Sequence, residues 1–286
     1  MSRKRVSSSK GQGSQLKKKV FLGLSISGGK TDKTCFSVIE YFPDQNKIFL
    51  SQLVDKIKTD KETSSDLKLH QLILPYEKSA TSLSMNVPLT WPKCIRCRLK
   101  CPGYEACKEK EIQWMWKKFR KNIKKNKLKK LFTPYTERCV EQYLASEIEE
   151  VFHLPHALGA NVAPLTARAF FIKKRLKLKF LEVYPKLNLW RIGRALGIQK
   201  SYLRAHKHAV SGLDARKAIL DNLVDMDVAF IYVQDFQTMV RDSHAFDAFI
   251  CALTGVLKYR NQCEKKPKDF PSSEGWIEIP KMEINW

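Results

Sequence analysis

Three short apolar segments near the N-terminus are joined by connections that are too short for anything but tight turns. Residues 20–27, 35–41 and 47–50 are rich in Val, Ile, Leu and Phe, and the intervening residues 28–33 and 43–46 contain Gly, Pro, Asp and Asn. Apolar runs of this length favour strands, and Gly, Pro, Asp and Asn favour turns. The chain is therefore expected to begin with three consecutive antiparallel strands.

The remaining pattern predicts strands that alternate with helices. We expect further strands at 81–87, 180–184 and 228–233, and helices at 67–74, 140–151, 164–176, 187–196, 215–224 and 236–258. Antiparallel strands followed by alternating strands and helices indicate an α/β fold with a mixed sheet flanked by helices.

The composition divides the chain into three parts. Residues 1–18 are mainly Ser, Gly and Lys, which predicts a disordered basic arm. Residues 19–262 carry the strand and helix pattern, interrupted at 91–134 by a Cys- and Lys-rich insertion. Residues 263–286 are expected to form a C-terminal tail over the surface. A chain of 286 residues has room for one large domain or two small ones.

Charge and hydropathy narrow the function classes. The chain has 52 Lys and Arg against 29 Asp and Glu, a net charge of +23, which indicates a polyanionic partner such as DNA or RNA. The alternative is that lysine serves solubility alone. A hydrophobic content of 43% argues against a wholly disordered protein. No apolar run reaches the roughly 18 residues of a membrane span, and residues 1–18 lack the apolar segment of a secretory signal, so we expect a cytoplasmic protein.

Four of the eight cysteines lie within 14 residues, with the spacing C-x2-C-x3-C-x5-C. In a reducing cytoplasm four such thiols are expected to bind a metal centre rather than to form disulfides. Zinc commonly uses two widely separated C-x2-C pairs, whereas one short irregular loop with Pro102 after the third cysteine favours a 4Fe-4S cluster; Zn²⁺ is the alternative. The alternative to any metal site is that these cysteines are inert. The predicted ligands are Cys94, Cys97, Cys101 and Cys107.

A cationic run follows the cysteines. Residues 114–130 contain two Trp and one Phe among many Lys and no acidic residue, a combination that suits phosphate neutralisation and base stacking. The alternative is a solvated helix face. The candidate nucleic-acid-binding residues are Arg96, Arg98, Trp114, Trp116, Lys117, Lys118, Arg120, Lys121, Lys124 and Lys125.

Two carboxylates fall in apolar surroundings. Asp247 lies in the apolar segment 245–253 and Glu182 lies within the strand predicted at 180–184. A buried carboxylate requires a cation, a metal or a proton. Each could form a buried ion pair with an arginine. Alternatively, both could belong to a catalytic site together with Asp242, which lies shortly before Asp247 in the helix predicted at 236–258.

Several segments, in order, resemble the predicted RNase H-like nuclease family of unknown function. They are Gly23-Leu24-Ser25-Ile26-Ser27-Gly28-Gly29-Lys30, Asn86-Val87-Pro88-Leu89, Trp91-Pro92-Lys93-Cys94, Thr136-Glu137-Arg138-Cys139, Glu182-Val183-Tyr184-Pro185 and His244-Ala245-Phe246-Asp247-Ala248-Phe249-Ile250-Cys251-Ala252. The similarity spans roughly residues 19–260. It implies an RNase H-like mixed sheet in which three antiparallel strands precede the parallel ones.

The resemblance also implies a site in which carboxylates hold Mg²⁺ or Mn²⁺ for phosphodiester hydrolysis. Two of the acid positions fall on Ser25 and Asn86, which cannot be anionic ligands, and leave Asp247, Asp242 and Glu182. Hard Mg²⁺ binds poorly when neutral oxygens replace carboxylates. Asp32 is a possible substitute acid.

Three hypotheses follow. The first is a nucleic-acid-binding protein with an RNase H-like core, a cysteine-ligated metal insertion and a degenerate nuclease site. The second is an active nuclease that depends on a divalent metal and uses relocated acids. The third is an iron-sulfur redox or sensor scaffold that binds a protein partner.

Overall fold

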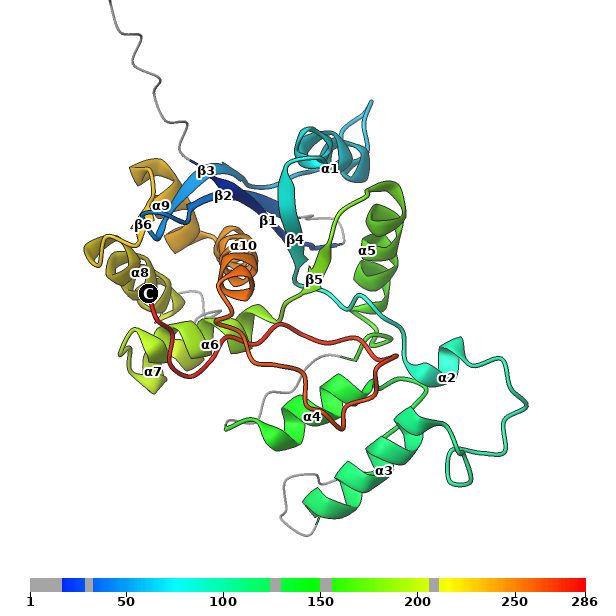
Figure 1. Cartoon of the computed structure of the whole chain (residues 1–286). Helices are drawn as coiled ribbons and strands as arrows, with labels where there is room; N and C mark the ends of the chain where they lie inside the picture. Colours follow the sequence, from blue (N-terminus) through cyan, green and yellow to red (C-terminus); the bar gives the residue numbers. More distant parts are fainter. Residues whose placement is uncertain (1–16, 29–32, 124–129, 150–155, 206–210) are drawn as a thin grey trace, which may run out of the picture.

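A six-stranded mixed sheet forms the centre of the computed structural model, which describes residues 17–28, 33–123, 130–149, 156–205 and 211–286 (Figure 1). The strand order is β5-β4-β1-β2-β3-β6. Strands β1, β2 and β3 are antiparallel neighbours, while β4 is parallel to β1, β5 to β4 and β6 to β3. The strands are β1 (Lys19–Ser25), β2 (Cys35–Phe42), β3 (Lys47–Val54), β4 (Ala80–Met85), β5 (Phe180–Glu182) and β6 (Ala229–Phe230). The three predicted antiparallel strands and the mixed α/β sheet are confirmed.

Helices cover both faces of the sheet (Figure 1). Helix α10 packs across one face, and α1 and α5 share a second apolar cluster with the opposite face. The described helices are α1 (Ser65–Ile73), the short 3-10 helix η1 (Leu74–Tyr76), α2 (Lys93–Arg96), α3 (Lys110–Ile123), α4 (Cys139–Glu147), α5 (Ala163–Arg175), α6 (Pro185–Ala195), α7 (Lys200–Arg204), α8 (Ser211–Asp225), α9 (Val233–Arg241) and α10 (Ser243–Tyr259).

Alternation along β1 decides which side chains face α10. Leu22 and Leu24 join the cluster under α1 and α5, whereas Phe21 joins the α10 side. At Gly23 the two elements approach so closely that a Cβ atom would lie 2.0 Å from a carbonyl oxygen of α10. Because side chains alternate along a strand, Ser25 lies on the α10 side with Phe21 and Gly23. The end of β1 therefore faces the helix that carries Asp247.

The single long helix predicted at 236–258 is wrong. Asp242 has an extended backbone, with φ −108° and ψ 112°, and it separates α9 from α10. Its side chain accepts a hydrogen bond of 2.8 Å from the His244 backbone N–H, so it caps α10. Helical periodicity runs through both segments, and only the cap interrupts it. The strand predicted at 228–233 is likewise shorter, covering Ala229–Phe230 alone.

The C-terminal residues return to the core instead of forming a tail over the surface. Ile277 and Ile279 are fully buried, and the Glu278 N–H donates to the Glu182 carbonyl over 2.9 Å. In Figure 1 this segment runs between α6 and α4. Most of the predicted basic arm, residues 1–16, lies outside the described residues. Among the helices that are described, none has the length and apolar character to cross a bilayer.

Candidate functional site

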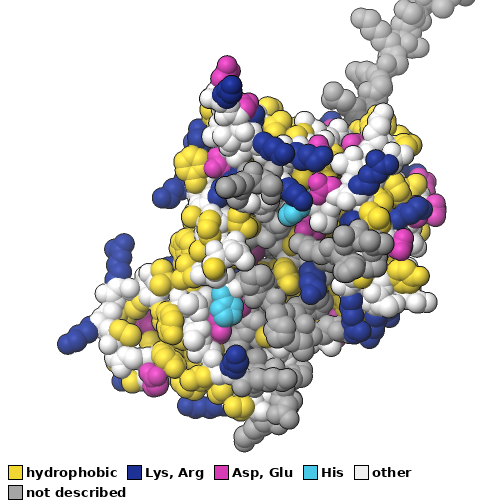
Figure 2. All heavy atoms as spheres, turned by 180° about the vertical axis from the view of Figure 1, so that it is seen from behind, with side chains coloured by type: hydrophobic (Ala, Val, Ile, Leu, Met, Phe, Trp, Pro, Cys, Tyr) yellow, Lys and Arg dark blue, Asp and Glu magenta, His cyan; other side chains and the backbone are white. Residues whose placement is uncertain are grey.

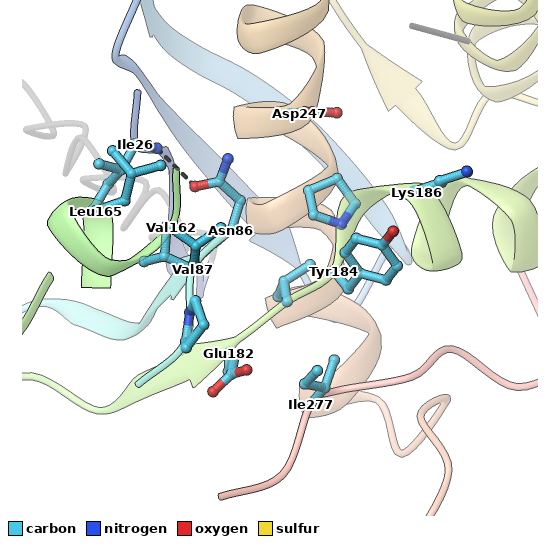
Figure 3. Close-up of a pocket in the computed structure, with 13 residues that line it drawn as sticks. Ile26, Asn86, Val87, Val162, Leu165, Glu182, Tyr184, Lys186, Asp247 and Ile277 are labelled. Carbon is cyan, nitrogen blue, oxygen red and sulfur yellow. Dashed lines mark hydrogen bonds between the residues drawn. The ribbon is translucent and has the colours of Figure 1, made fainter. Parts of the chain in front are cut away.

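A cavity of about 220 Å³ lies at the carboxyl ends of β4 and β5 and just beyond the end of β1. Ile26 and Asn86 line it directly after β1 and β4, Tyr184 follows β5, and Asp247 enters from α10 (Figure 3). Carboxyl ends of parallel strands are where ligands bind in open α/β sheets. Segments more than 200 residues apart in the chain, at Ile26 and Asp247, thus meet at one edge.

A neutral hydrogen-bonded pair occupies the adjacent ends of β1 and β4. The Asn86 Nδ2 donates to Ser25 Oγ over 3.0 Å, and the Ile26 N–H donates to Asn86 Oδ1 over 2.7 Å. Ser25 is fully buried. The two positions that the family resemblance assigned to acids therefore do lie side by side, but their polar atoms bind one another and carry no charge.

Asp247 and Glu182 are two buried carboxylates that line this cavity, and they are 1% and 5% exposed. Burial, with the added effect of the Asp247 charge, raises the pKa of Tyr184 to about 12. Burial lowers the pKa of Arg216, and the charges of Asp247 and Asp242 oppose that shift. Asp247 thus lies within electrostatic reach of the Tyr184 phenol and the Arg216 guanidinium. A nearby cation is one of the ways in which a buried carboxylate is stabilised.

Glu182 is held in a buried ion cluster. Arg138 donates to both of its carboxylate oxygens over 2.8 Å each, and the Leu89 N–H donates to Oε2 over 2.8 Å. Arg138 also donates from Nε to Glu141 over 2.8 Å. Arg138 is 1% exposed. Burial lowers the pKa of its guanidinium, but Glu182 and Glu141 raise this pKa by more than burial lowers it, so the guanidinium stays charged. In Figure 3 the Glu182 carboxylate points away from Asp247.

The predicted acids are therefore distributed over different tasks. Asp247 lines the cavity, Glu182 accepts from Arg138, and Asp242 caps α10. Asp32 lies outside the described residues. Throughout the part of the chain that is described, no three His, Cys, Asp or Glu side chains are arranged to hold a metal ion.

The four clustered cysteines line a second cavity of about 380 Å³. Burial, followed by the neighbouring thiolates of Cys107, Cys101 and Cys97, raises the pKa of Cys94 to about 11. Cys94 therefore lies close enough to the other three thiols to interact with them electrostatically. Within 33–123 they border the cavity instead of meeting around a point where one ion would bind.

Ion pairs join the two ends of this cysteine loop to each other and attach its first part to Glu274. Lys93 lies 2.6 Å from Glu109 and 3.5 Å from Glu111. Arg96 donates to Glu274 over 2.8 Å, and the same carboxylate accepts from the Cys139 N–H over 3.2 Å. Glu274 thus connects the cysteine loop to Cys139, and the preceding residue, Arg138, binds Glu182. Arg96, predicted to bind nucleic acid, is used here for attachment.

Helix α3 presents cations on one side and apolar residues on the other. Its buried residues include Ile112, Trp114 and Met115, and its exposed cations are Lys110, Lys117, Arg120 and Lys121. We call these four cations the α3 stripe. Arg98, Lys100 and Lys108 of the cysteine loop are also exposed. Seen from behind, Lys and Arg side chains project from the lobe at the lower left, on the insertion side of the molecule (Figure 2).

The aromatic residues of the run pack inward. Trp114 is 5% exposed and its ring contacts Phe270 at 5.1 Å between centroids. Trp116 is half-buried against Phe132 at 4.9 Å, and its Nε1 donates to the Tyr104 carbonyl over 3.1 Å. A buried indole cannot stack on a base without leaving its core. The stacking role predicted for Trp114 is therefore replaced by a packing role.

The other candidate cations have different surroundings. Lys118 is buried, over the Trp114 ring at 5.2 Å and 3.7 Å from Glu147. Arg98 is exposed. Lys124 and Lys125 lie outside the described residues. The interior position of Lys118 shows that a sequence run of lysines does not form one uniform face, because a helix turns its successive residues toward different sides.

Two structurally central residues were not identified as site residues from the sequence. Arg138 neutralises Glu182, and Glu274 connects Arg96 to the Cys139 backbone. The need of Glu182 for a cation was apparent from its strand, but the pattern could not select one arginine among many. Glu274 lies in a Pro-rich segment whose composition suggested surface exposure, so no sequence signal marked it.

A family model described as "Protein of unknown function (DUF429)" matches residues 129–271, half of the chain. The matched region contains Arg138, Glu182 and Asp247, whereas Ser25, Asn86 and the four clustered cysteines precede it. No curated protein and no solved structure matches the chain.

Proposed function

The chain belongs to DUF429, a family of proteins of unknown function, and from its geometry we propose that it binds nucleic acid through a cationic insertion, on an RNase H-like core whose nuclease site is degenerate. Three observations support this: the strand order, the loss of charge at the sheet edge and the one-sided cations of α3.

The strand order supports the RNase H-like core. Three antiparallel strands come first, β4 and β5 add in parallel beyond β1, and α10 lies across the face that carries Ser25. The short parallel pairing of β6 with β3 extends the opposite edge. Three antiparallel strands followed by parallel ones are what the family resemblance implies for the sheet.

The sheet edge supports binding without hydrolysis. Two-metal catalysis needs several carboxylates around a shared pair of ions. Here Ser25 and Asn86 satisfy one another at 3.0 Å, and Glu182 is neutralised by Arg138. Asp247 is the remaining predicted acid that lines the cavity. One carboxylate with neutral oxygen ligands gives weak affinity for Mg²⁺.

The observation that carries the binding function is the α3 stripe. Its cations face solvent because Ile112, Trp114 and Met115 of the same helix are buried. Exposed Lys and Arg on one helix face can each displace a counterion from a phosphate backbone, which is a sequence-independent source of affinity. The packed tryptophans hold the stripe in place, so we assign contacts to phosphates and none to bases.

We further propose that the four cysteines bind a metal centre, zinc or iron-sulfur, which orders the cationic loop. The loop has few apolar residues of its own, and metal binding supplies folding free energy to such segments. Cys94, Cys97, Cys101 and Cys107 line one cavity, so their thiolates are the expected ligands. We place the protein in the cytoplasm, where such thiols stay reduced.

The test is a salt titration of binding. Fluorescence anisotropy with labelled single- and double-stranded DNA and RNA measures affinity as the salt concentration rises. Replacing Lys117, Arg120 and Lys121 by Gln is expected to weaken binding about tenfold or more at low salt and to lower the salt slope by about 2–3. Their contacts are surface ones, from Lys117 to Asp269 at 3.6 Å, from Lys121 to Glu147 at 3.5 Å and from Arg120 to the Trp116 ring at 5.5 Å, and exposed ion pairs contribute only about 0–1 kcal/mol, so the fold should tolerate the change.

The matched control removes the same charge elsewhere. Lys173, Lys174 and Arg175 are exposed in the last turn of α5, which leads to the amino end of β5, away from the cavity at the carboxyl ends. Equal loss of binding in both triple variants would contradict the α3 interface. No affinity for any nucleic acid would favour a redox or sensor scaffold instead. Cleavage with Mg²⁺ or Mn²⁺ that disappears in Asp247→Asn would show an active nuclease.

A further inference from the structure

The four thiols of the cysteine loop border one cavity of about 380 Å³ and, within 33–123, are not arranged around a point where one ion would bind. A zinc ion binds thiolates at about 2.3 Å, so four ligands would have to draw together around a single point. A cluster places inorganic atoms between the thiolates and fills the space.

The residues that line the cavity are of the types expected around an iron-sulfur cluster. Leu99, Pro102, Ala106 and Ile112 contribute apolar surface between the cysteines. Lys93, Lys100 and Lys108 line it as well and can offset the negative charge of four thiolates. Solvent exposure and nearby charge are among the features by which proteins set the reduction potential of an iron-sulfur cluster.

The four ligands differ in access to solvent. Cys101 is exposed, whereas Cys94, Cys97 and Cys107 are half-buried. A group held by all four would be covered on three sides and open at Cys101. Lys93 joins the start of the loop to Glu109 at its end, and Arg96 ties the first part of the loop to Glu274. These ion pairs hold Cys94 and Cys107 on the same side of the cavity.

We propose that Cys94, Cys97, Cys101 and Cys107 ligate a 4Fe-4S cluster, rather than zinc, whose solvent-exposed corner lies at Cys101. This inference rests on the metal centre of the proposed function and does not depend on nucleic-acid binding. Assembly takes up two ferrous ions, two ferric ions and four sulfide ions, and the four thiols each release one proton as they bind iron, so no further oxidant or reductant is needed. No change in the oxidation state of the cysteines is involved.

The test is anaerobic reconstitution of the full chain with iron and sulfide, and in parallel with zinc. We expect about four iron and four sulfide per chain, broad absorption in the visible, and an electron paramagnetic resonance signal after reduction by dithionite. Cys101→Ser is expected to keep less iron than the wild-type chain. Cys263→Ser changes a buried cysteine far from the loop in sequence and should leave iron retention unchanged.

Other outcomes would overturn the cluster. One zinc per chain with no uptake of iron would make this a mononuclear site, and no uptake of either metal would remove the metal centre altogether. Equal iron loss in the Cys101 and Cys263 variants would contradict the assigned ligands. Nucleic-acid affinity is measured on the same samples, so a failed cluster with retained binding leaves the binding function standing.

Discussion

Replacing Arg138 by Met removes the cation that neutralises Glu182 and Glu141. Met retains much of the side-chain volume, so the main loss is electrostatic rather than a cavity. Glu182 keeps the Leu89 N–H as a donor, and Glu141 keeps the Arg138 backbone N–H over 2.9 Å. Both carboxylates remain buried without their positive partner.

The magnitude follows from the burial of the cluster. Both carboxylates are 5% exposed and Arg138 is 1% exposed, so solvent screens little of the lost interaction. Breaking a buried ion pair by removing one partner costs about 3–5 kcal/mol. We expect Arg138→Met to lower the free energy of unfolding by that amount, and Glu182→Gln, which leaves Arg138 paired with Glu141, by about 1–3 kcal/mol.

The stability that Arg138→Met loses should depend on pH. Burial already raises the pKa of Glu141, and Arg138 opposes that shift. Without Arg138 the pKa of Glu141 in the folded state is expected to rise further above the unfolded value. A raised folded pKa favours the protonated acid, so stability is retained at low pH and is lost as the pH rises through the folded pKa. The variant should therefore lie closest to the wild type near pH 5 and fall behind toward pH 8.

Urea unfolding followed by circular dichroism measures these differences, and a double-mutant cycle isolates the Arg138–Glu182 coupling. Arg194→Met is the control, because Arg194 donates to the Ile198 carbonyl over 3.0 Å rather than to a carboxylate. A loss below about 1 kcal/mol in Arg138→Met, or a coupling near zero, would refute the reasoning. Glu182 would then be free to act as a catalytic acid.

Three further predictions test other parts of the molecule. Replacing Ser25 and Asn86 together by Asp should lower the melting temperature without metal and create stabilisation by Mg²⁺ that the wild type lacks; equal stabilisation of the wild type would argue against a degenerate site. Gly23→Ala should cost about 3 kcal/mol or more in denaturant unfolding, because the new Cβ would meet an α10 carbonyl oxygen at 2.0 Å; an unchanged midpoint would contradict that close approach. Burial raises the pKa of Cys35 to about 12, so iodoacetamide at pH 8 should modify exposed Cys101 in the metal-free protein and leave Cys35 unmodified by mass spectrometry, whereas similar labelling would contradict the burial.

Much of the sheet could be predicted from the sequence. Residues 20–50 alternate apolar runs with turn residues, and the observed β1, β2 and β3 follow them. Local signals were sufficient because hairpins form between neighbouring segments. The break at Asp242 and the return of Ile277 to the core were not predictable in this way. A cap is one residue within a continuous helical pattern, and the burial of a late segment depends on distant partners.

The candidate site was likewise predictable from the sequence only in part. The sequence identified Asp247 and Glu182 as carboxylates in apolar surroundings and grouped the four cysteines by their spacing. It could not distinguish their roles, because a buried carboxylate looks the same in sequence whether Arg138 or a ligand lies beside it. It also presented Trp114 and Lys118 as surface residues within a cationic run, although α3 turns both of them inward.

The sequence by itself determined which structural and chemical elements this protein has. They are three antiparallel strands at the start of a mixed sheet, a group of four cysteines, an excess of cations, and the neutral residues Ser25 and Asn86 at positions where the family resemblance implies acids. These properties depend on residue type and short spacing, which folding does not change. Only the tertiary structure decided which groups meet. It paired Asn86 with Ser25, gave Glu182 to Arg138 and left Asp247 at the cavity, because each contact joins segments separated by dozens of residues whose distance is set by the packing of the sheet and helices.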